Sequence, residues 1–510
     1  MQTTDNASTL LEANLEAGRS GAPAIITAAD ETWTFTDLYR ATCRVASRLA
    51  DLGVGREDRV LLVLDDTPAF PAAFLGAMRI GAVPVPVNFL ARPEDFGYFL
   101  DDSYAVAAVV DAVFLGVVGP QLDKRDHVLR VVANGSEDGY ESLDVWLEDG
   151  SDELDPVSTH PDDPAFWLYS SGSTGVPKAV VHRHADIGAT CRHYAWPTLG
   201  IQHGDVVFSS TKMFHAYGLG NNLTFPLSVG ATSVYLTGRP TPTALLERVA
   251  EHHPSLFFSV PALYNAMLAN EAFDRTDWTS VRLGVSAAEP LPPEIWRRFH
   301  DRTGIEILDG LGSTEMLHLY CSNRAGRVKP GTSGTAVDGY EVDLRDEEGV
   351  SIDGDGPGEL WVRGPSAFTG YWHQVARTRA KLNGGWFATG DRYHRDEDGY
   401  FVYEGRVDDM MKVGGLWVSP IEIENRLMEH PAVREAAVVG LEIDNVSRIK
   451  AAVILAGDQA GDDDLVRELQ EWCKEALLRY QYPHVVEFVL DFPRTPTGKI
   501  QRFKLREAHS

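Results

Sequence analysis

Cysteine is scarce in this sequence of 510 residues, and basic residues are outnumbered by acidic ones. The four cysteines are too few and too scattered for a disulfide framework, so we expect reduced thiols. The 46 lysines and arginines stand against 74 aspartates and glutamates, which leaves a formal net charge of −28. This surplus of negative charge argues against binding to a nucleic-acid backbone or to an anionic membrane. We therefore expect small molecules or proteins as partners, with no nucleic acid and no membrane.

Long apolar runs are also missing. No uninterrupted stretch of about 18 apolar residues occurs, and residues 1–5 do not begin a basic and then apolar secretory signal. We therefore expect a cytoplasmic protein. Hydrophobic residues still make up 44% of the chain and aromatic residues 10%, which is sufficient for large folded cores.

Short β-branched runs alternate with helical stretches in the first part of the chain, which favours βαβ units around a mostly parallel sheet. Prolines place the strand at 83–87 on a sheet edge. An acidic stretch at 135–164 is expected to be a surface excursion or a joint between subdomains. The pattern predicts a helix at 68–80 and strands at 60–64, 83–87, 105–110 and 128–132.

The region after Asp408 has a different pattern. Short strands are predicted at 436–439 and 450–455, and an amphipathic helix is predicted over 463–480. Cys473 lies on the apolar stripe of that helix and is expected to be a core thiol. The segment 409–510 is long enough to fold as a second domain.

The most informative segment is the loop at 169–178, with the sequence Tyr-Ser-Ser-Gly-Ser-Thr-Gly-Val-Pro-Lys, which follows an apolar strand. Hydroxyl groups, glycines and a lysine in one loop suit a polyphosphate, because glycine permits close backbone approach and lysine neutralises charge. The loop is not a Walker A motif, since Val176 and Pro177 separate the glycine from the lysine. A flexible Gly/Ser linker is the alternative interpretation.

Other patterns support a function less well. A zinc site is not predicted, because the candidate ligands fit no usual finger spacing and a helix is expected there; these candidates are His182, His184, Cys191 and His193. The Gly-Leu-Gly at 310–312 is only a fragment of a dinucleotide fingerprint, and no Gly-x-Ser-x-Gly elbow of a hydrolase occurs.

Several motifs follow the phosphate loop in order and together resemble the adenylate-forming superfamily of acyl- and aryl-CoA synthetases, peptide-synthetase adenylation domains and luciferases. They are Ser171-Gly-Ser-Thr-Gly-Val-Pro-Lys178, Gly312-Ser-Thr-Glu315, Thr389-Gly-Asp391, Gly405-Arg-Val-Asp-Asp409 and Pro496-Thr-Gly-Lys499. The longer stretches 214–221, 309–318 and 412–420 look most similar to the benzoate-CoA ligase branch.

The resemblance implies an α/β fold with two domains. A large N-terminal body of several subdomains with mostly parallel sheets would cover 1–407, and a small mobile α+β domain would cover 409–510, with a hinge at Asp408. The implied reaction joins a carboxylic acid to ATP as an acyl-adenylate, releases pyrophosphate, and passes the acyl group to coenzyme A. ATP, coenzyme A and Mg²⁺ are the implied cofactors.

Residue roles follow from the matching motifs. The resemblance implies that Lys499 bridges carboxylate and nucleotide, that Glu315 ligates Mg²⁺, and that Thr314 contacts the α-phosphate. Asp391 would hold the ribose hydroxyls with support from Arg406. The other implied ATP- or AMP-binding residues are Ser171, Gly172, Ser173, Thr174, Gly175, Lys178, Ala288, Glu289, Asp309 and Gly310.

The branch resemblance also implies an acid pocket and a CoA-facing loop. The pocket would be mostly apolar and suited to an aromatic or bulky cyclic acid, with His215 near its mouth as a catalytic residue beside the carboxylate. Its other implied residues are Ala216, Tyr217, Gly312, His318 and Leu319. Thioester formation would use Lys412, Gly414, Gly415, Leu416 and Trp417, where two glycines permit close approach to pantetheine.

Two positions depart from the family pattern. Ala179 and Ala288 stand where glycine is usual, and each adds a methyl group where the backbone approaches nucleotide or needs permissive dihedral angles. If residue 288 requires a positive φ, ATP binding is weakened. The chain would then be better suited to forming a thioester from an acyl-adenylate supplied by a companion adenylating enzyme.

Further alternatives stay open at this point. The acyl acceptor is either coenzyme A or the phosphopantetheine of a carrier protein, and a homodimer is an open assembly. A luciferase-like oxygenase or an interaction protein without catalysis would retain the same fold. The intact set of charged motif residues, Lys178, Glu315, Asp391, Arg406 and Lys499, argues against the non-catalytic alternative.

Overall fold

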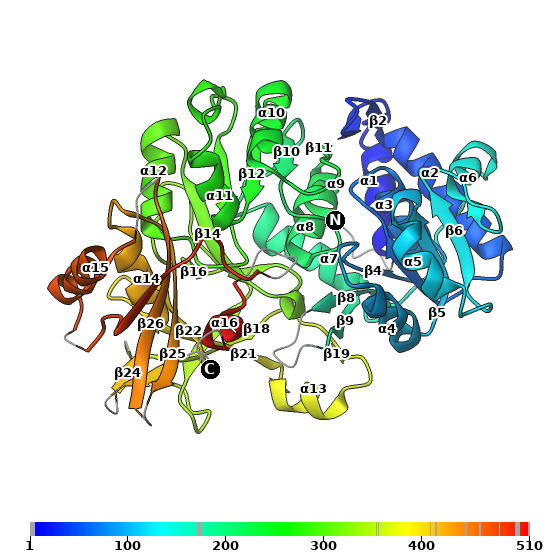
Figure 1. The fold of residues 1–510 in the computed structure, drawn as a ribbon. Helices are drawn as coiled ribbons and strands as arrows, with labels where there is room; N and C mark the ends of the chain where they lie inside the picture. Colours follow the sequence, from blue (N-terminus) through cyan, green and yellow to red (C-terminus); the bar gives the residue numbers. More distant parts are fainter. Residues whose placement is uncertain are drawn as a thin grey trace.

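The computed structural model describes residues 6–170, 176–352, 354, 356–407, 410–413, 416–443, 446–457, 461–478, 480–494 and 500–507. Figure 1 shows two layered α/β units, smaller antiparallel sheets, and the C-terminal unit in orange and red. This arrangement agrees with the predicted fold class.

The first α/β unit is a parallel sheet with the strand order β4-β3-β5-β6-β7. The predicted edge position of the proline-containing strand β4 is confirmed. Part of the acidic 135–164 stretch is not an excursion, because it forms β7 and α6, where Trp146 is buried. The elements are α2 (Phe35–Asp51), β3 (Arg59–Val63), α3 (Ala69–Arg79), β4 (Val83–Pro86), α4 (Pro93–Ser103), β5 (Ala105–Asp111), η2 (Ala112–Phe114), α5 (Leu115–Leu122), β6 (Leu129–Ala133), β7 (Glu141–Ser142) and α6 (Leu143–Asp149).

The second α/β unit has the strand order β16-β15-β14-β13-β12-β10-β11-β1-β2, parallel from β14 to β1 and antiparallel at both edges. Its strands are β1 (Pro23–Ile26), β2 (Thr32–Thr34), β10 (Val206–Ser209), β11 (Thr232–Val234), β12 (Leu256–Ser259), β13 (Leu283–Ser286), β14 (Ile307–Gly312), β15 (Leu319–Ser322) and β16 (Thr335–Ala336). Its helices and turns are η1 (Ala7–Thr9), α1 (Leu10–Glu16), α7 (His184–Thr190), η3 (Cys191–Ala195), α8 (Ala216–Leu219), η4 (Gly220–Thr224), α9 (Phe225–Val229), α10 (Pro242–His252), α11 (Pro261–Leu268), η5 (Phe273–Arg275), α12 (Pro293–Thr303) and η6 (Thr314–Met316).

Antiparallel pairs connect these units. One sheet has the order β19-β9-β8, and another has the order β17-β18-β21-β20 with β22 paired to β21. The helix expected in the segment of the candidate zinc ligands, 182–193, is present from His184 as α7, while Lys178–Arg183 form the strand β9. The elements are β8 (Pro164–Ser170), β9 (Lys178–Arg183), β17 (Glu341–Arg345), β18 (Gly358–Arg363), β19 (Gly370–Tyr371), α13 (Val375–Lys381), β20 (Leu382–Asn383), β21 (Trp386–Arg395) and β22 (Phe401–Arg406).

In the described residues after 410, the C-terminal unit combines the sheet β25-β26-β27, the paired strands β23 and β24, and the helices α14, α15 and α16. It packs beside α12 and β22 (Figure 1). Ser419 Oγ donates to the Glu404 carbonyl at 2.5 Å. The predicted helix over 463–480 ends four residues early, while Cys473 is buried as expected. The elements are β23 (Met411–Val413), β24 (Leu416–Val418), α14 (Pro420–Met428), β25 (Val433–Ile443), β26 (Val446–Leu455), α15 (Asp463–Ala476), β27 (Val485–Phe488) and α16 (Arg502–Glu507).

The main hydrophobic core runs through both α/β units and the sheets between them, and the C-terminal unit has its own core. All four cysteines are buried and unpaired by disulfides, as predicted. Within the described residues, no helix is long and apolar enough to cross a membrane.

Candidate active site

Lys178 opens β9 directly after the phosphate loop and points into a buried polar cluster. Its Nζ lies 2.8 Å from Oε1 of Glu315 and 3.0 Å from the hydroxyl of Tyr371, and it sits 4.3 Å from the Tyr371 ring centroid. The Tyr371 hydroxyl also donates to Glu315 Oε1 at 2.7 Å. Two predicted site residues, 137 positions apart, are therefore brought together, with a tyrosine that the motifs did not indicate.

Glu315 lies in the short turn η6, where the Ser313 hydroxyl accepts from the Met316 N–H at 3.3 Å. Burial alone would raise the pKa of Glu315, but the ammonium of Lys178 and the hydroxyl of Tyr371 outweigh burial and keep that pKa below its ordinary value. An ionised, hard carboxylate oxygen is the kind of ligand that Mg²⁺ takes, together with phosphate and water oxygens. The donor chemistry at Glu315 therefore fits a magnesium ion.

Asp391 and Arg406 are cross-strand neighbours on β21 and β22. Arg406 Nη1 lies 2.9 Å from Oδ1 of Asp391 and 3.2 Å from the carbonyl of Thr389. The Asp391 N–H donates to the Thr389 hydroxyl at 3.0 Å. The carboxylate is thus held at one oxygen by a cation, as expected of a group that also accepts hydrogen bonds from a ligand.

The carboxyl ends of β13 and β14 bring Ala288 and Asp309 to one edge of the parallel sheet, because Ser286 and Asp309 are register partners. Ala288 is exposed and has a φ of +77°, in the left-handed region that favours glycine. Residue 288 therefore has the positive φ that was named from the sequence as the condition for weakened ATP binding. Glu289 is half-buried beside it, whereas the other departure, Ala179, is buried within β9.

Asp309 is 5% exposed, and its Oδ2 accepts from the Leu291 N–H at 3.2 Å. Burial raises the pKa of Asp309 to about 8, against the hydrogen bond from Leu291, so this carboxyl group holds its proton at neutral pH. The next residue, Gly310, passes so close to β15 that a Cβ there would lie 2.8 Å from the Cys321 carbonyl oxygen.

The predicted acid-pocket residues gather around His318. Its ring centroid lies 5.4 Å from Tyr217 and 4.5 Å from Phe225, and its Nε2 lies 3.2 Å from Asn221 Oδ1. Burial lowers the pKa of His318 to about 3, so the ring is neutral. Phe225 and Asn221 were not among the predicted site residues. Close backbone packing also surrounds the ring, since a Cβ at Gly220 would lie 2.5 Å from it.

The remaining pocket residues lie on neighbouring backbone. Leu319 is buried at the start of β15, and a Cβ at Gly312 would lie 2.7 Å from the His318 carbonyl oxygen. Half-buried His215 precedes Ala216 at the start of α8, and its ring packs on Phe214 with centroids 4.3 Å apart.

A buried ion pair anchors the loop that leads to His215. Lys212 Nζ lies 2.7 Å from Asp65 Oδ1 and 3.9 Å from Asp66 Oδ2, and Asp66 Oδ1 accepts from the Met213 N–H at 3.1 Å. Burial raises the pKa of Asp66 to about 6, with Lys212 opposing that shift. This cluster joins the ends of strands from both α/β units and was not indicated by any motif.

Several predicted site residues lie outside the described residues: Ser171, Gly172, Ser173, Thr174 and Gly175 of the phosphate loop, Asp408, Gly414, Gly415 and Lys499. Lys412 is in β23, and Leu416 and Trp417 are in β24, so these three occupy paired antiparallel strands.

The four side chains considered as zinc ligands contact different groups. His182 contacts Asp186 and the Thr314 carbonyl, and His184 Nδ1 accepts from the Ala7 N–H at 3.1 Å. Cys191 faces the Thr224 carbonyl, and His193 faces the Asp338 carbonyl. The four side chains thus have separate partners.

Family models cover most of the chain. The model described as AMP-binding enzyme matches residues 11–372, and the model described as AMP-binding enzyme C-terminal domain matches residues 422–499. Among curated proteins, the chain is 47% identical to a benzoate–CoA ligase of Thauera aromatica, covering 98% of this chain and 95% of the relative. It is 41% identical to a 4-hydroxybenzoate–CoA/benzoate–CoA ligase of Rhodopseudomonas palustris, covering 98% and 93%.

Solved structures show the same similarity. A benzoate CoA ligase from Burkholderia xenovorans LB400 matches with a TM-score of 0.92 and 42% identity, covering 98% of this chain and 99% of that one. The anthranilate CoA ligase AuaEII in complex with anthranoyl-AMP matches with a TM-score of 0.96 and 37% identity, covering 100% and 98%. The chain belongs to the AMP-binding family of adenylate-forming enzymes, as its ordered motifs predicted.

Proposed function

We propose that this chain is an aryl-CoA ligase that activates an aromatic carboxylic acid with ATP and transfers the acyl group to coenzyme A. The observation that carries the proposal is the ion pair between half-buried Lys178 and buried Glu315 beside Thr314, which combines a phosphate-neutralising cation with a hard carboxylate. The names of the relatives, which are ligases for benzoate, 4-hydroxybenzoate and anthranilate, support an aryl acid as the substrate.

In the first half-reaction, one carboxylate oxygen of the acid attacks the α-phosphorus of ATP, and the bond to pyrophosphate breaks. Catalysis of such a step depends mainly on positioning and on charge placed where negative charge develops. Lys178 would neutralise phosphate oxygens, Thr314 would contact the α-phosphate, and Lys499 would bridge the carboxylate and the nucleotide. Glu315 would hold Mg²⁺, which would supply charge neutralisation for the phosphates.

The nucleotide and the acid would occupy neighbouring parts of the site. Asp391, fixed by Arg406, would accept hydrogen bonds from the ribose hydroxyls. Residues at the carboxyl edge of the parallel sheet, Ala288 and Asp309 among them, would line the adenine side. The neutral ring of His318 and the ring of Tyr217 would form an apolar, flat wall for the aryl group, with His215 near the carboxylate.

In the second half-reaction, the thiol of coenzyme A attacks the acyl carbon, and AMP leaves. The hairpin that contains Lys412, Leu416 and Trp417 would approach the site after rotation of the C-terminal unit about Asp408.

Because ATP and coenzyme A are cytoplasmic metabolites, we propose a cytoplasmic location.

The proposal is tested by incubating the protein with ATP, Mg²⁺ and coenzyme A against benzoate, hydroxybenzoates, anthranilate, cyclohexanecarboxylate and a fatty acid, with thioesters detected by mass spectrometry. We expect aryl-CoA products, with AMP and pyrophosphate, from at least one benzoate. In a parallel reaction, a phosphopantetheinylated carrier protein replaces coenzyme A as the acyl acceptor. Thioester formation only on the carrier, or only with the fatty acid, would overturn the proposal.

A further inference from the structure

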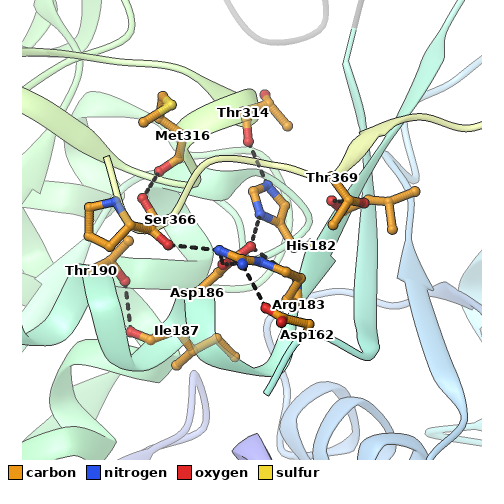
Figure 2. A network of polar contacts seen from close by, with 12 residues as sticks. Asp162, His182, Arg183, Asp186, Ile187, Thr190, Thr314, Met316, Ser366 and Thr369 are labelled. Atoms are coloured by element: carbon orange, nitrogen blue, oxygen red, sulfur yellow. Dashed lines mark hydrogen bonds and ion pairs between the residues drawn. The ribbon is translucent and has the colours of Figure 1, made fainter. Parts of the chain in front are cut away.

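The turn η6, which carries Thr314 and Glu315, is held by hydrogen bonds to its backbone carbonyl groups. The carbonyl oxygens of its three residues accept, in order, from His182 Nε2 at 2.7 Å, from the Phe368 N–H at 2.8 Å and from Ser366 Oγ at 2.7 Å. Figure 2 shows the first and the last of these contacts reaching the turn from different segments. The backbone of the turn is thereby fixed on one side.

The His182 ring is fully buried and donates toward the turn. A carbonyl oxygen can only accept, so Nε2 carries a proton and donates to Thr314. Asp186 Oδ2 lies 2.9 Å from Nδ1, and the same carboxylate accepts three hydrogen bonds from the N–H, Nε and Nη2 groups of Arg183. Both ring nitrogens are therefore engaged, Nε2 with the Thr314 carbonyl and Nδ1 with the Asp186 carboxylate.

Arg183 links this contact to the second segment that holds the turn. Its Nη2 donates to the Pro365 carbonyl at 2.8 Å, one residue before the Ser366 hydroxyl that reaches the turn, and its Nη1 lies 2.8 Å from Asp162 (Figure 2). Because Asp186 and Pro365 share one planar guanidinium, the two supports cannot shift independently.

We propose that His182 is a positioning residue for adenylation. It lies on β9, the strand that begins with Lys178, and it contacts the turn that carries Glu315. A contact at 2.7 Å between β9 and this turn therefore fixes the spacing at which Lys178 Nζ and Glu315 Oε1 stand 2.8 Å apart. Thr314, whose carbonyl is held directly, is the proposed contact of the α-phosphate. This inference rests on the proposed function.

Two amide substitutions separate the contacts of the ring. The amide of His182→Gln places an N–H near the position of Nε2 and retains the hydrogen bond to the Thr314 carbonyl. The shorter amide of His182→Asn places an N–H near the position of Nδ1 and retains only the contact to Asp186. Both variants lose the ring and any positive charge, so their shared effects cancel in the comparison. We expect His182→Asn to lower kcat for ATP–pyrophosphate exchange at least tenfold, and His182→Gln to stay within about threefold of the unaltered protein.

The KM for benzoate should be unchanged in both variants, because the acid pocket around His318 is not held by this contact. His193, whose ring contacts the Asp338 carbonyl, provides the control. The variants His193→Gln and His193→Asn should have equal kcat values for exchange. Denaturation midpoints identify variants that fail to fold. If neither His182 variant folds, Ser366→Ala provides the test, and it should lower kcat for exchange with an unchanged KM for benzoate.

Equal exchange rates in folded His182→Gln and His182→Asn would overturn the positioning role, as would a defect that appears only in the KM for benzoate. Absence of exchange in the unaltered protein with every aryl acid would instead refute the proposed function. The two failures are therefore distinguishable.

Discussion

Ala288→Gly should strengthen ATP use by this protein, which is opposite to the usual effect of a substitution near an active site. Ala288 has a φ of +77°, and a non-glycine residue in that region costs about 1 to 2 kcal/mol. The Ala288 side chain is exposed, so removing its methyl group leaves no cavity. Glycine adds about 0.4 to 1 kcal/mol of unfolded-chain entropy. The net relief is therefore about 0.5 to 1 kcal/mol.

Because the positive φ is already present without ATP, part of this relief raises the denaturation midpoint, and the part borne on binding adenine lowers the KM for ATP by up to about two- to fivefold. The assay is ATP–pyrophosphate exchange over a range of ATP concentrations at saturating benzoate, with denaturation midpoints measured alongside. Ala287→Gly is the matched control, because Ala287 is buried, does not have a positive φ, and should lose stability. An unchanged or raised KM for ATP in Ala288→Gly, with both variants equally destabilised, would refute the reasoning.

Three further substitutions test the polar site. Lys178→Met should abolish adenylation and cost about 3 kcal/mol of stability, because the Glu315 carboxylate is left buried without its cation; a denaturation midpoint equal to that of the unaltered protein would contradict this. Asp391→Asn should raise the KM for ATP about ten- to a hundredfold and leave the KM for benzoate unchanged, since a charge-assisted hydrogen bond contributes about 1.5 to 3 kcal/mol; steady-state kinetics measure the split. Burial raises the Asp309 pKa from 3.8 to about 8, so this group takes up a proton on folding. Its contribution to the free energy of unfolding is therefore lost as pH rises from about 4 to 8. The denaturation midpoint of Asp309→Asn, measured relative to that of the unaltered protein, should therefore rise from about pH 4 to 8. Parallel pH profiles of the two midpoints would contradict this titration of the carboxyl group.

The sequence predicted those parts of the fold that depend on local pattern. The strand at 60–64 and the helix at 68–80 match β3 and α3 within one residue at each end, because apolar periodicity is a local property. Strand β9 was missed, since Lys178–Arg183 become a strand only by pairing with β8 and β19. The predicted helix at 463–480 was too long because Tyr480 continues the apolar stripe, although the helix ends at Ala476.

The site was predictable as a set of motifs, but its contacts were not. Tyr371 joins Lys178 across 193 positions, and no local signal indicates a tyrosine whose role depends on tertiary packing. His182 was considered only as a metal ligand, although an Asp four residues later is a usable signal for a fixed imidazole. Ala288 is the opposite case, because the departure from glycine was visible in the sequence and the structure supplied the positive φ.

The central claim, an acyl-adenylate between the acid and the thioester, is tested most directly by following carboxylate oxygen. Benzoate labelled with oxygen-18 in its carboxyl group is incubated with the protein, ATP, Mg²⁺ and coenzyme A, and the products are analysed by mass spectrometry. We expect one labelled oxygen in AMP for each benzoyl-CoA formed, because the attacking carboxylate oxygen stays on the α-phosphorus. Label in inorganic phosphate with formation of ADP, or thioester formed with unlabelled AMP, would contradict it.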